Sequence, residues 1–220
     1  MVGEFHNDML VSDIKVGIDV AFNNNITKVK KVSYDKALDI QYGFYTQEPY
    51  KGALTINCKA SHGALDWIID TIATPYKTGN GKVHKGFYKE LEYYWVKVRN
   101  DILSLGWDIS KGIIVSGKSK GAGEAILLIP YLSDLGKVHI CGAIDPPKVC
   151  DDKYSEYLDS FGAKMFITSY KNDIVTGIPF WFKHPTQVLQ NGKRRLGLSV
   201  KDHIKATTEE EIWYEYIKTL

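Results

Sequence analysis

The sequence predicts an α/β fold in which a mostly parallel sheet carries helices on both faces. Short apolar runs typical of buried strands alternate with segments whose apolar residues recur every three or four positions. No internal repeat, low-complexity tract or Pro/Ser-rich linker divides the chain, so residues 1–220 are predicted to form a single domain. A chain of this length buries enough surface to fold without a metal or a disulfide.

The predicted elements are clearest in the middle of the chain. Residues 53–56 are expected to form a strand, and the helical spacing of apolar residues from Phe87 to Leu105 predicts an amphipathic helix. The apolar run 112–116 suits a buried parallel strand. Helical spacing returns over residues 121–129, and Pro130 is expected to interrupt that helix.

The C-terminal half continues the alternation. Further elements are expected there in chain order: a strand over 138–143, a short helix over 154–161 and a strand over 164–170. Thr208 and Glu211 have the spacing of a capping box, which predicts a closing helix directly after His203. Residues 1–50 form a poorly defined N-terminal segment, in which the pattern does not separate strand from loop.

Composition and charge exclude several classes of function. The 28 basic and 26 acidic side chains give a net charge of +2, so no field favours nucleic-acid binding. The three cysteines form no Cys-x-x-Cys pair and are expected to be buried, and no metal or organic cofactor is implied. No apolar stretch approaches a membrane span, and the N-terminus lacks a secretory signal. A soluble, cytoplasmic protein is therefore expected, with secretion requiring a leader that has been removed.

Ser119 is the candidate nucleophile. It lies in Gly117-Lys118-Ser119-Lys120-Gly121, a match to the Gly-x-Ser-x-Gly elbow in which a strained strand-to-helix turn presents a serine hydroxyl. The pentapeptide alone is a weak signal, but the predicted strand precedes it and the predicted helix follows it. The positive end of that helix would stabilise negative charge on a reacting oxygen.

A serine nucleophile needs a histidine to take its proton and an acid to orient that histidine. In folds with this elbow the acid and then the histidine follow the serine. Of the three histidines after Ser119, His139 falls in a predicted strand, whereas His203 precedes the closing helix at a position from which it could reach the sheet edge. Asp173 directly follows the strand 164–170, where sites of α/β proteins are built. Three other acids are less well placed: Asp145, Asp151 and Asp152.

Five blocks of sequence extend this interpretation. They are Cys58-Lys59-Ala60-Ser61 followed by Asp66-Trp67, Val83-His84-Lys85-Gly86-Phe87, the elbow Gly117 to Gly123, Asn172-Asp173-Ile174-Val175 with Pro179 and His184, and Asp202-His203. Together they resemble the class 3 lipase family of α/β-hydrolases from about residue 54 to the C-terminus. The resemblance implies the α/β-hydrolase fold.

The resemblance also implies roles for individual residues. Ser119 would be the nucleophile, His203 the general base and acid, and Asp173 its orienting carboxylate. The oxyanion hole would come from Ser61 and the backbone N–H of Lys120. By the same pattern His184 is structural, and the segment 62–72 corresponds to a lid that could contact a lipid interface, although a core-facing helix fits its apolar residues equally well.

The implied activity is a serine hydrolase that cleaves carboxylic esters through an acyl-enzyme, with a small-molecule or lipid ester as substrate. Acylglycerols or phospholipids are the default of the family, and a small ester or an acetyl group remains open. Two alternatives also stay open: a binding module that has lost activity, and an acyltransferase or thioesterase with the same triad. Lys118 and Lys120 depart from the family's elbow. They are either solvated or paired surface charges, or they attract an anionic group of the substrate.

Overall fold

The computed structural model describes residues 9–34, 38–60 and 74–220. Within these residues seven strands form one sheet in the order β1-β2-β3-β6-β7-β8-β9. The bounds are β1 Ile26–Tyr34, β2 Leu38–Tyr45, β3 Leu54–Cys58, β6 Ile113–Lys118, β7 Val138–Ile144, β8 Lys164–Tyr170 and β9 Val188–Asn191. The sheet is antiparallel from β1 to β3 and parallel from β3 to β9. This mostly parallel sheet confirms the predicted fold class.

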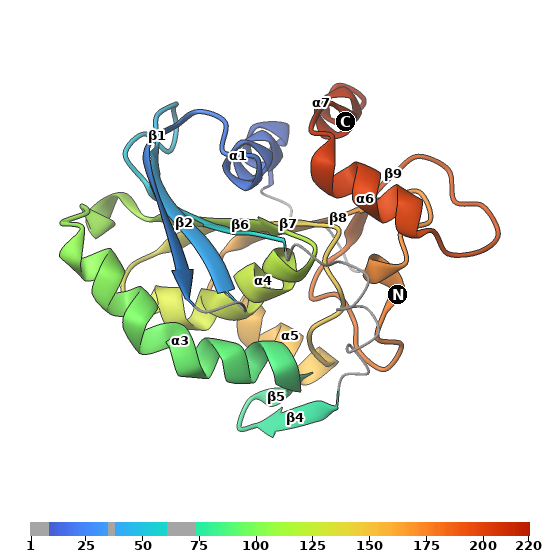
Figure 1. The fold of residues 1–220 in the computed structure, drawn as a ribbon, viewed down its shortest axis with the longest axis horizontal. Coiled ribbons are helices and arrows are strands. Elements are labelled where there is room, and N and C mark those ends of the chain that lie inside the picture. Colours follow the sequence, from blue (N-terminus) through green and yellow to red (C-terminus); the bar gives the residue numbers. More distant parts are fainter. Residues whose placement is uncertain (1–8, 35–37, 61–73) are drawn as a thin grey trace.

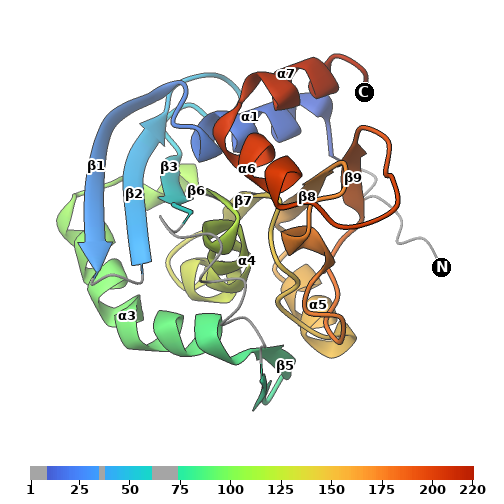
Figure 2. The ribbon, with the colours of Figure 1, turned by 45° about the vertical axis from the view of Figure 1, so that its right-hand side comes forward.

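Helices cover both faces of the sheet (Figure 1). On one face lie α1 Val11–Ala21, α6 Val200–Thr208 and α7 Glu211–Ile217, and on the other lie α3 Lys85–Ser104, α4 Lys120–Ser133 and α5 Asp152–Asp159. The turned view in Figure 2 shows α6 beside the ends of β7 and β8. A separate hairpin, β4 Pro75–Thr78 and β5 Gly81–His84, precedes α3. Among the described helices none is long and apolar enough to cross a membrane.

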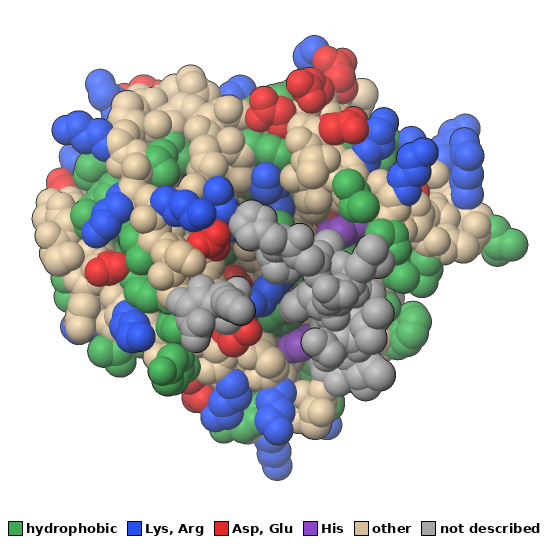
Figure 3. All heavy atoms as spheres, viewed as in Figure 1, with side chains coloured by type: hydrophobic (Ala, Val, Ile, Leu, Met, Phe, Trp, Pro, Cys, Tyr) green, Lys and Arg blue, Asp and Glu red, His purple; other side chains and the backbone are tan. Residues whose placement is uncertain are grey.

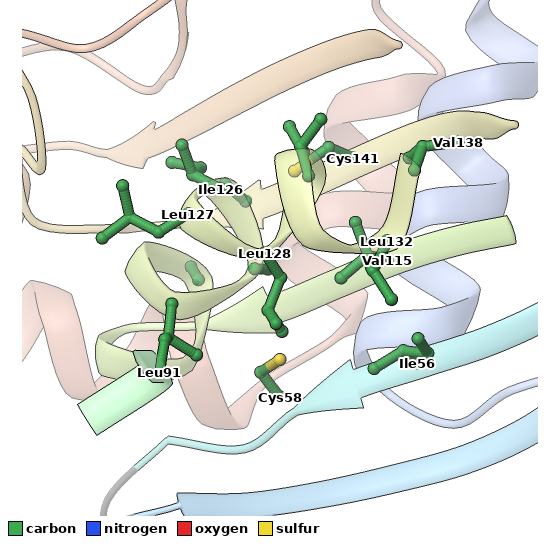
Figure 4. Close-up of a cluster of buried hydrophobic side chains, with 14 of the residues drawn as sticks. Ile56, Cys58, Leu91, Val115, Ile126, Leu127, Leu128, Leu132, Val138 and Cys141 are labelled. Carbon is green, nitrogen blue, oxygen red and sulfur yellow. The ribbon is translucent and has the colours of Figure 1, made fainter. Parts of the chain in front are cut away.

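Each face of the sheet has its own apolar core. Figure 4 shows the core beneath α4, where side chains of the helix pack on those of β3, β6 and β7. The second core joins α1 and α7 to the opposite face and includes Trp213. Cys58, Cys141 and Cys150 are buried free thiols, as the sequence predicts. The central strands are thus buried on both sides, which fits their continuous apolar runs.

Two predicted helix ends are wrong. Pro130 does not interrupt α4, which continues to Ser133. A proline removes one helical hydrogen bond, but Leu127, Leu128 and Leu132 on either side of it are fully buried, and their packing offsets that loss.

The predicted capping box is also wrong. Thr208 is the last residue of α6, and its hydroxyl donates a 2.7 Å hydrogen bond to the Ile204 carbonyl within that helix. The hydroxyl is therefore not available to cap α7, whose N-cap residue is Glu210. His203 consequently lies inside a helix rather than in the loop before one.

The N-terminal segment contains three elements that the sequence left undefined, namely α1, β1 and β2. Two acids of α1 are buried, Asp13 and Asp19. Asp13 accepts hydrogen bonds from Lys164 Nζ at 2.8 Å and Tyr50 Oη at 2.8 Å. Lys164 and Tyr50 lie far from Asp13 in the chain. The sequence of α1 alone therefore does not show why an acid is buried among its apolar residues.

Candidate active site

Ser119 lies at the turn between β6 and α4. Its φ of 53° and ψ of −125° belong to a region that L-residues adopt only under constraint. The constraint comes from the sheet: the Ser119 N–H donates to the Ile144 carbonyl at 2.9 Å, and α4 begins at the next residue. The turn thereby holds the serine at the carboxyl edge of the parallel strands, as the elbow motif predicts.

The glycines of the elbow allow the end of β3 to approach the turn. A Cβ added to Gly121 would lie 2.2 Å from the carbonyl oxygen of Cys58. One added to Gly117 would lie 2.4 Å from the carbonyl oxygen of Gly121. Both contacts are with backbone, which cannot move aside as a side chain can. These two glycines are therefore needed for close packing.

Gly121→Ala is expected to lower the free energy of unfolding by about 3 kcal/mol, because the methyl group overpacks the contact with β3. Urea unfolding followed by circular dichroism measures this change. Gly79→Ala is the matched control, since a Cβ there meets nothing within 4 Å and should change stability by less than about 0.5 kcal/mol. Equal stability of the two variants would contradict the packing argument.

The three residues selected from the sequence lie in one hydrogen-bonded chain. His203 Nε2 lies 2.8 Å from Ser119 Oγ, and His203 Nδ1 lies 2.7 Å from Asp173 Oδ2. The second carboxylate oxygen of Asp173 accepts the Val175 N–H at 2.6 Å. All three side chains are buried, with His203 only 1% exposed. The arrangement fixes the imidazole between a hydroxyl and a carboxylate.

The start of α6 is tied to the loop that carries Asp173. Ser199 Oγ caps the helix by accepting the Asp202 N–H at 3.0 Å. The backbone of Ser199 also donates to the Asn172 carbonyl at 2.7 Å. Because one residue caps the helix and pairs with the loop, the position of His203 is set relative to Asp173.

Asp145 is a site residue whose importance the sequence interpretation underestimated. It directly follows β7, has a φ of 47°, and accepts the Tyr170 N–H at its Oδ1 at 2.8 Å. The Asp145 carboxyl is fully buried. Burial first, and then the charge of Asp173, raise the pKa of Asp145 well above its usual value. The sequence could have indicated Asp145, because it follows a buried strand as Asp173 does.

His184 lies outside the hydrogen-bonded chain. Its Nε2 is 2.9 Å from the main-chain oxygen of Thr176, in the turn after Asp173. Burial lowers the pKa of His184 to about 4, so the ring is neutral at pH 7. This contact suits the structural role expected for His184.

The side chain of Lys120 is paired with acids, as one of the two expectations has it, but it is buried and not at the surface. It is 5% exposed, and its Nζ lies 2.8 Å from Glu90 and 3.2 Å from Glu124. Burial alone would lower the Lys120 pKa, but the two carboxylates outweigh it and raise the pKa. The ammonium is thus held between α3 and α4.

Glu124 should make the free energy of unfolding depend on pH. Burial raises its pKa from 4.5 to about 8, helped by Glu90 and opposed by Lys120. The folded state therefore keeps a proton that the unfolded state releases near pH 4.5, so the free energy of unfolding should fall as pH rises from there through about 8. Glu124→Gln, measured by urea unfolding at a series of pH values, is expected to flatten this decline. An unchanged decline would contradict the assignment.

Two expectations fall outside the described residues. Ser61, proposed for the oxyanion hole, and the segment 62–72, proposed as a lid, both belong to the range 61–73. The other proposed oxyanion donor, the backbone N–H of Lys120, lies in the first turn of α4 beside Ser119.

Figure 3 shows basic side chains on several sides of the viewed face, interleaved with acidic ones.

The sheet order, the elbow after β6 and the helices on both faces define the α/β-hydrolase fold. A model of the lipase (class 3) family matches residues 55–183, more than half of the 220 residues. The chain therefore belongs to the class 3 lipase family and is a carboxylic ester hydrolase. The matched range includes Ser119 and Asp173, whereas His203 lies beyond it.

Three solved lipase structures share this fold. A triacylglycerol lipase described as having a serine-protease triad aligns with a TM-score of 0.69 and 15% identity, over 89% of each chain. A deletion mutant of the Rhizomucor miehei lipase in its propeptide complex aligns with a TM-score of 0.66 and 17% identity, over 83% of this chain and 67% of that one. The Lip2 lipase of Yarrowia lipolytica aligns with a TM-score of 0.60 and 15% identity, over 80% of this chain and 70% of that one. No curated protein sequence matches the chain significantly.

Proposed function

We propose that this ester hydrolase uses Ser119, His203 and Asp173 as a catalytic triad and forms an acyl-enzyme on Ser119. The observation that carries the proposal is the hydrogen-bonded chain from Ser119 Oγ through both ring nitrogens of His203 to Asp173. A serine hydroxyl is a poor nucleophile at its ordinary pKa and needs a base at this distance.

The first half-reaction transfers the acyl group to the enzyme. Ser119 Oγ attacks the ester carbonyl carbon while His203 Nε2 takes its proton, and Asp173 stabilises the resulting imidazolium. The tetrahedral oxyanion would accept a hydrogen bond from the Lys120 N–H, near the positive end of α4, and from Ser61. The C–O bond to the alcohol then breaks, and His203 returns the proton to the departing alcohol oxygen.

The second half-reaction releases the acid. A water molecule gives a proton to His203 and attacks the acyl carbon, and the proton then passes to Ser119 Oγ as the acid leaves. A protonated Asp145 beside Asp173 would hold the triad carboxylate in place by donating a hydrogen bond.

Hydrolysis of 4-nitrophenyl acetate, butyrate and octanoate and of emulsified triacylglycerol tests this proposal. The expected result is an initial burst of 4-nitrophenol equal to the enzyme concentration, followed by steady release of free acid. Detergent is included to open any lid. Acyl products formed on an added alcohol or thiol in preference to free acid would favour an acyltransferase, and no turnover of any ester would favour a binding module.

A further inference from the structure

The cleft in front of Ser119 has a basic wall. The cleft encloses about 300 Å³. Its lining includes Lys59, Lys118, Asn57, Ile204, Ser119 and His203. Lys59 follows β3 and Lys118 is the last residue of β6. The two strands are parallel neighbours, so both lysines lie at the carboxyl edge of the sheet, where Ser119 also lies. Lys59 and Lys118 therefore line the same cleft as Ser119.

Lys118 has no carboxylate partner among the residues that the structure describes. Its Nζ lies 4.2 Å from the centre of the Phe22 ring, directly after α1. Burial first, and then the charge of Lys59, lower the pKa of Lys118, while Glu210 acts in the opposite direction. An ammonium whose main neighbours are an aromatic ring and a second ammonium would gain from a bound anion.

Lys59 is also without an ion pair in the described part of the chain. The acid on which it acts electrostatically is Asp39, whose carboxylate is already paired with Lys31 at 3.3 Å. This contrasts with Lys120, whose Nζ lies 2.8 Å from Glu90 and 3.2 Å from Glu124. Lys120 is thus paired, while Lys59 and Lys118 line the cleft without a paired acid in the described part of the chain.

The same wall carries an additional polar group. Asn57 is 2% exposed, and its amide donates to Asn23 Oδ1 at 3.0 Å. Its own Oδ1 has no hydrogen-bond partner among the described residues. A wall of two lysines and an amide differs from the apolar lining that an acyl chain requires.

We propose that Lys59 and Lys118 form a subsite for an anionic group, such as a carboxylate, a sulfonate or a phosphate, on the ester that Ser119 attacks. The inference rests on the proposed function, since it places the anion relative to an ester carbonyl at Ser119. Attraction between unlike charges a few ångströms apart in a half-buried cleft would favour such an ester over its neutral counterpart.

Two pairs of esters test the subsite and locate the charge. One pair, 4-acetoxybenzenesulfonate and 4-acetoxybenzenesulfonamide, differs by a charge on the alcohol side. The other, the 4-nitrophenyl monoester of adipic acid and 4-nitrophenyl hexanoate, differs by a charge on the acyl side. The quantity compared is the ratio of kcat/KM for the anionic ester to that for the neutral ester.

In at least one pair, Lys59→Met and Lys118→Met are each expected to lower this ratio about 10-fold, equivalent to about 1.4 kcal/mol. Lys59→Arg and Lys118→Arg keep the charge and should retain most of the ratio. Lys82→Met, on the exposed edge of β5, is the matched control and should leave the ratio at the wild-type value. Raising the salt concentration should lower the wild-type ratio.

Unchanged ratios in both methionine variants, with neutral esters still hydrolysed, would overturn the subsite and leave the proposed function standing. If a methionine variant does not fold, a wild-type ratio that is independent of salt overturns it instead. If the wild-type protein hydrolyses none of the four esters, the proposed function fails and the subsite fails with it.

Discussion

Replacing either Ser119 or His203 with alanine is expected to lower kcat for ester hydrolysis by about 10⁵-fold. Each change removes one end of the 2.8 Å contact between Ser119 Oγ and His203 Nε2, and without it the nucleophile is either absent or not activated. The measurement is steady-state hydrolysis of 4-nitrophenyl butyrate, with circular dichroism to verify that the variants are folded.

The double variant gives a sharper comparison. Because the two residues would act as a unit, Ser119→Ala with His203→Ala should be no slower than either single variant within about 10-fold. Losses that multiply, or a single variant that retains more than about one hundredth of the wild-type kcat, would show that these residues do not form a nucleophile and base pair.

Asp173→Asn is expected to lower kcat by about 10⁴-fold while KM changes little. An amide can present its NH₂ group to His203 Nδ1, now 2.7 Å from a carboxylate oxygen, and it would then favour the wrong ring tautomer. The neutral amide also cannot stabilise an imidazolium. The measurement is kcat across pH 6 to about 9, the range in which imidazole protonation matters.

Asp202→Asn is the matched control for that experiment. Asp202 immediately precedes His203, yet its carboxylate accepts only a 3.4 Å contact from the Asn172 N–H. Its loss should change kcat by less than about threefold, as expected for a group without direct electrostatic contact with the reacting atoms. Equal losses in the two variants would mean that Asp173 has no special role.

The parallel part of the fold could be predicted from the sequence because its signals are local. The strand over residues 164–170 has the bounds that the apolar run predicts, and the strands at Ser119 and before Asp145 differ from the prediction by one or two residues. A strand buried on both faces gives a continuous apolar run, which needs no knowledge of its partners.

Helix α1 could not be predicted because several of its stabilising contacts are distant. In α1 the buried Asp19 accepts hydrogen bonds from Tyr45 at 3.1 Å and Tyr214 at 2.5 Å, residues that belong to β2 and α7. A buried acid in an apolar helix contradicts local pattern rules until its partners are known. The Phe22 contact of Lys118 is hidden for the same reason.

The candidate site was predicted in part. Chain order and the positions of acids after strands selected Ser119, Asp173 and His203, and the structure brings these three together. The helical environment of His203 was missed because Thr208 was interpreted as a cap. The ion pair between Lys120 and Glu90 could not be predicted either, because it forms only when α3 packs against α4.

Labelling with a fluorophosphonate probe tests the central claim, an activated serine at position 119, most directly. Wild-type protein, Ser119→Ala and His203→Ala are treated with the probe with and without detergent, and mass spectrometry locates the adduct. The account predicts a single adduct on Ser119 in the wild-type protein and none in either variant. A folded wild-type protein that is not labelled under either condition, or is labelled at another residue, would contradict it.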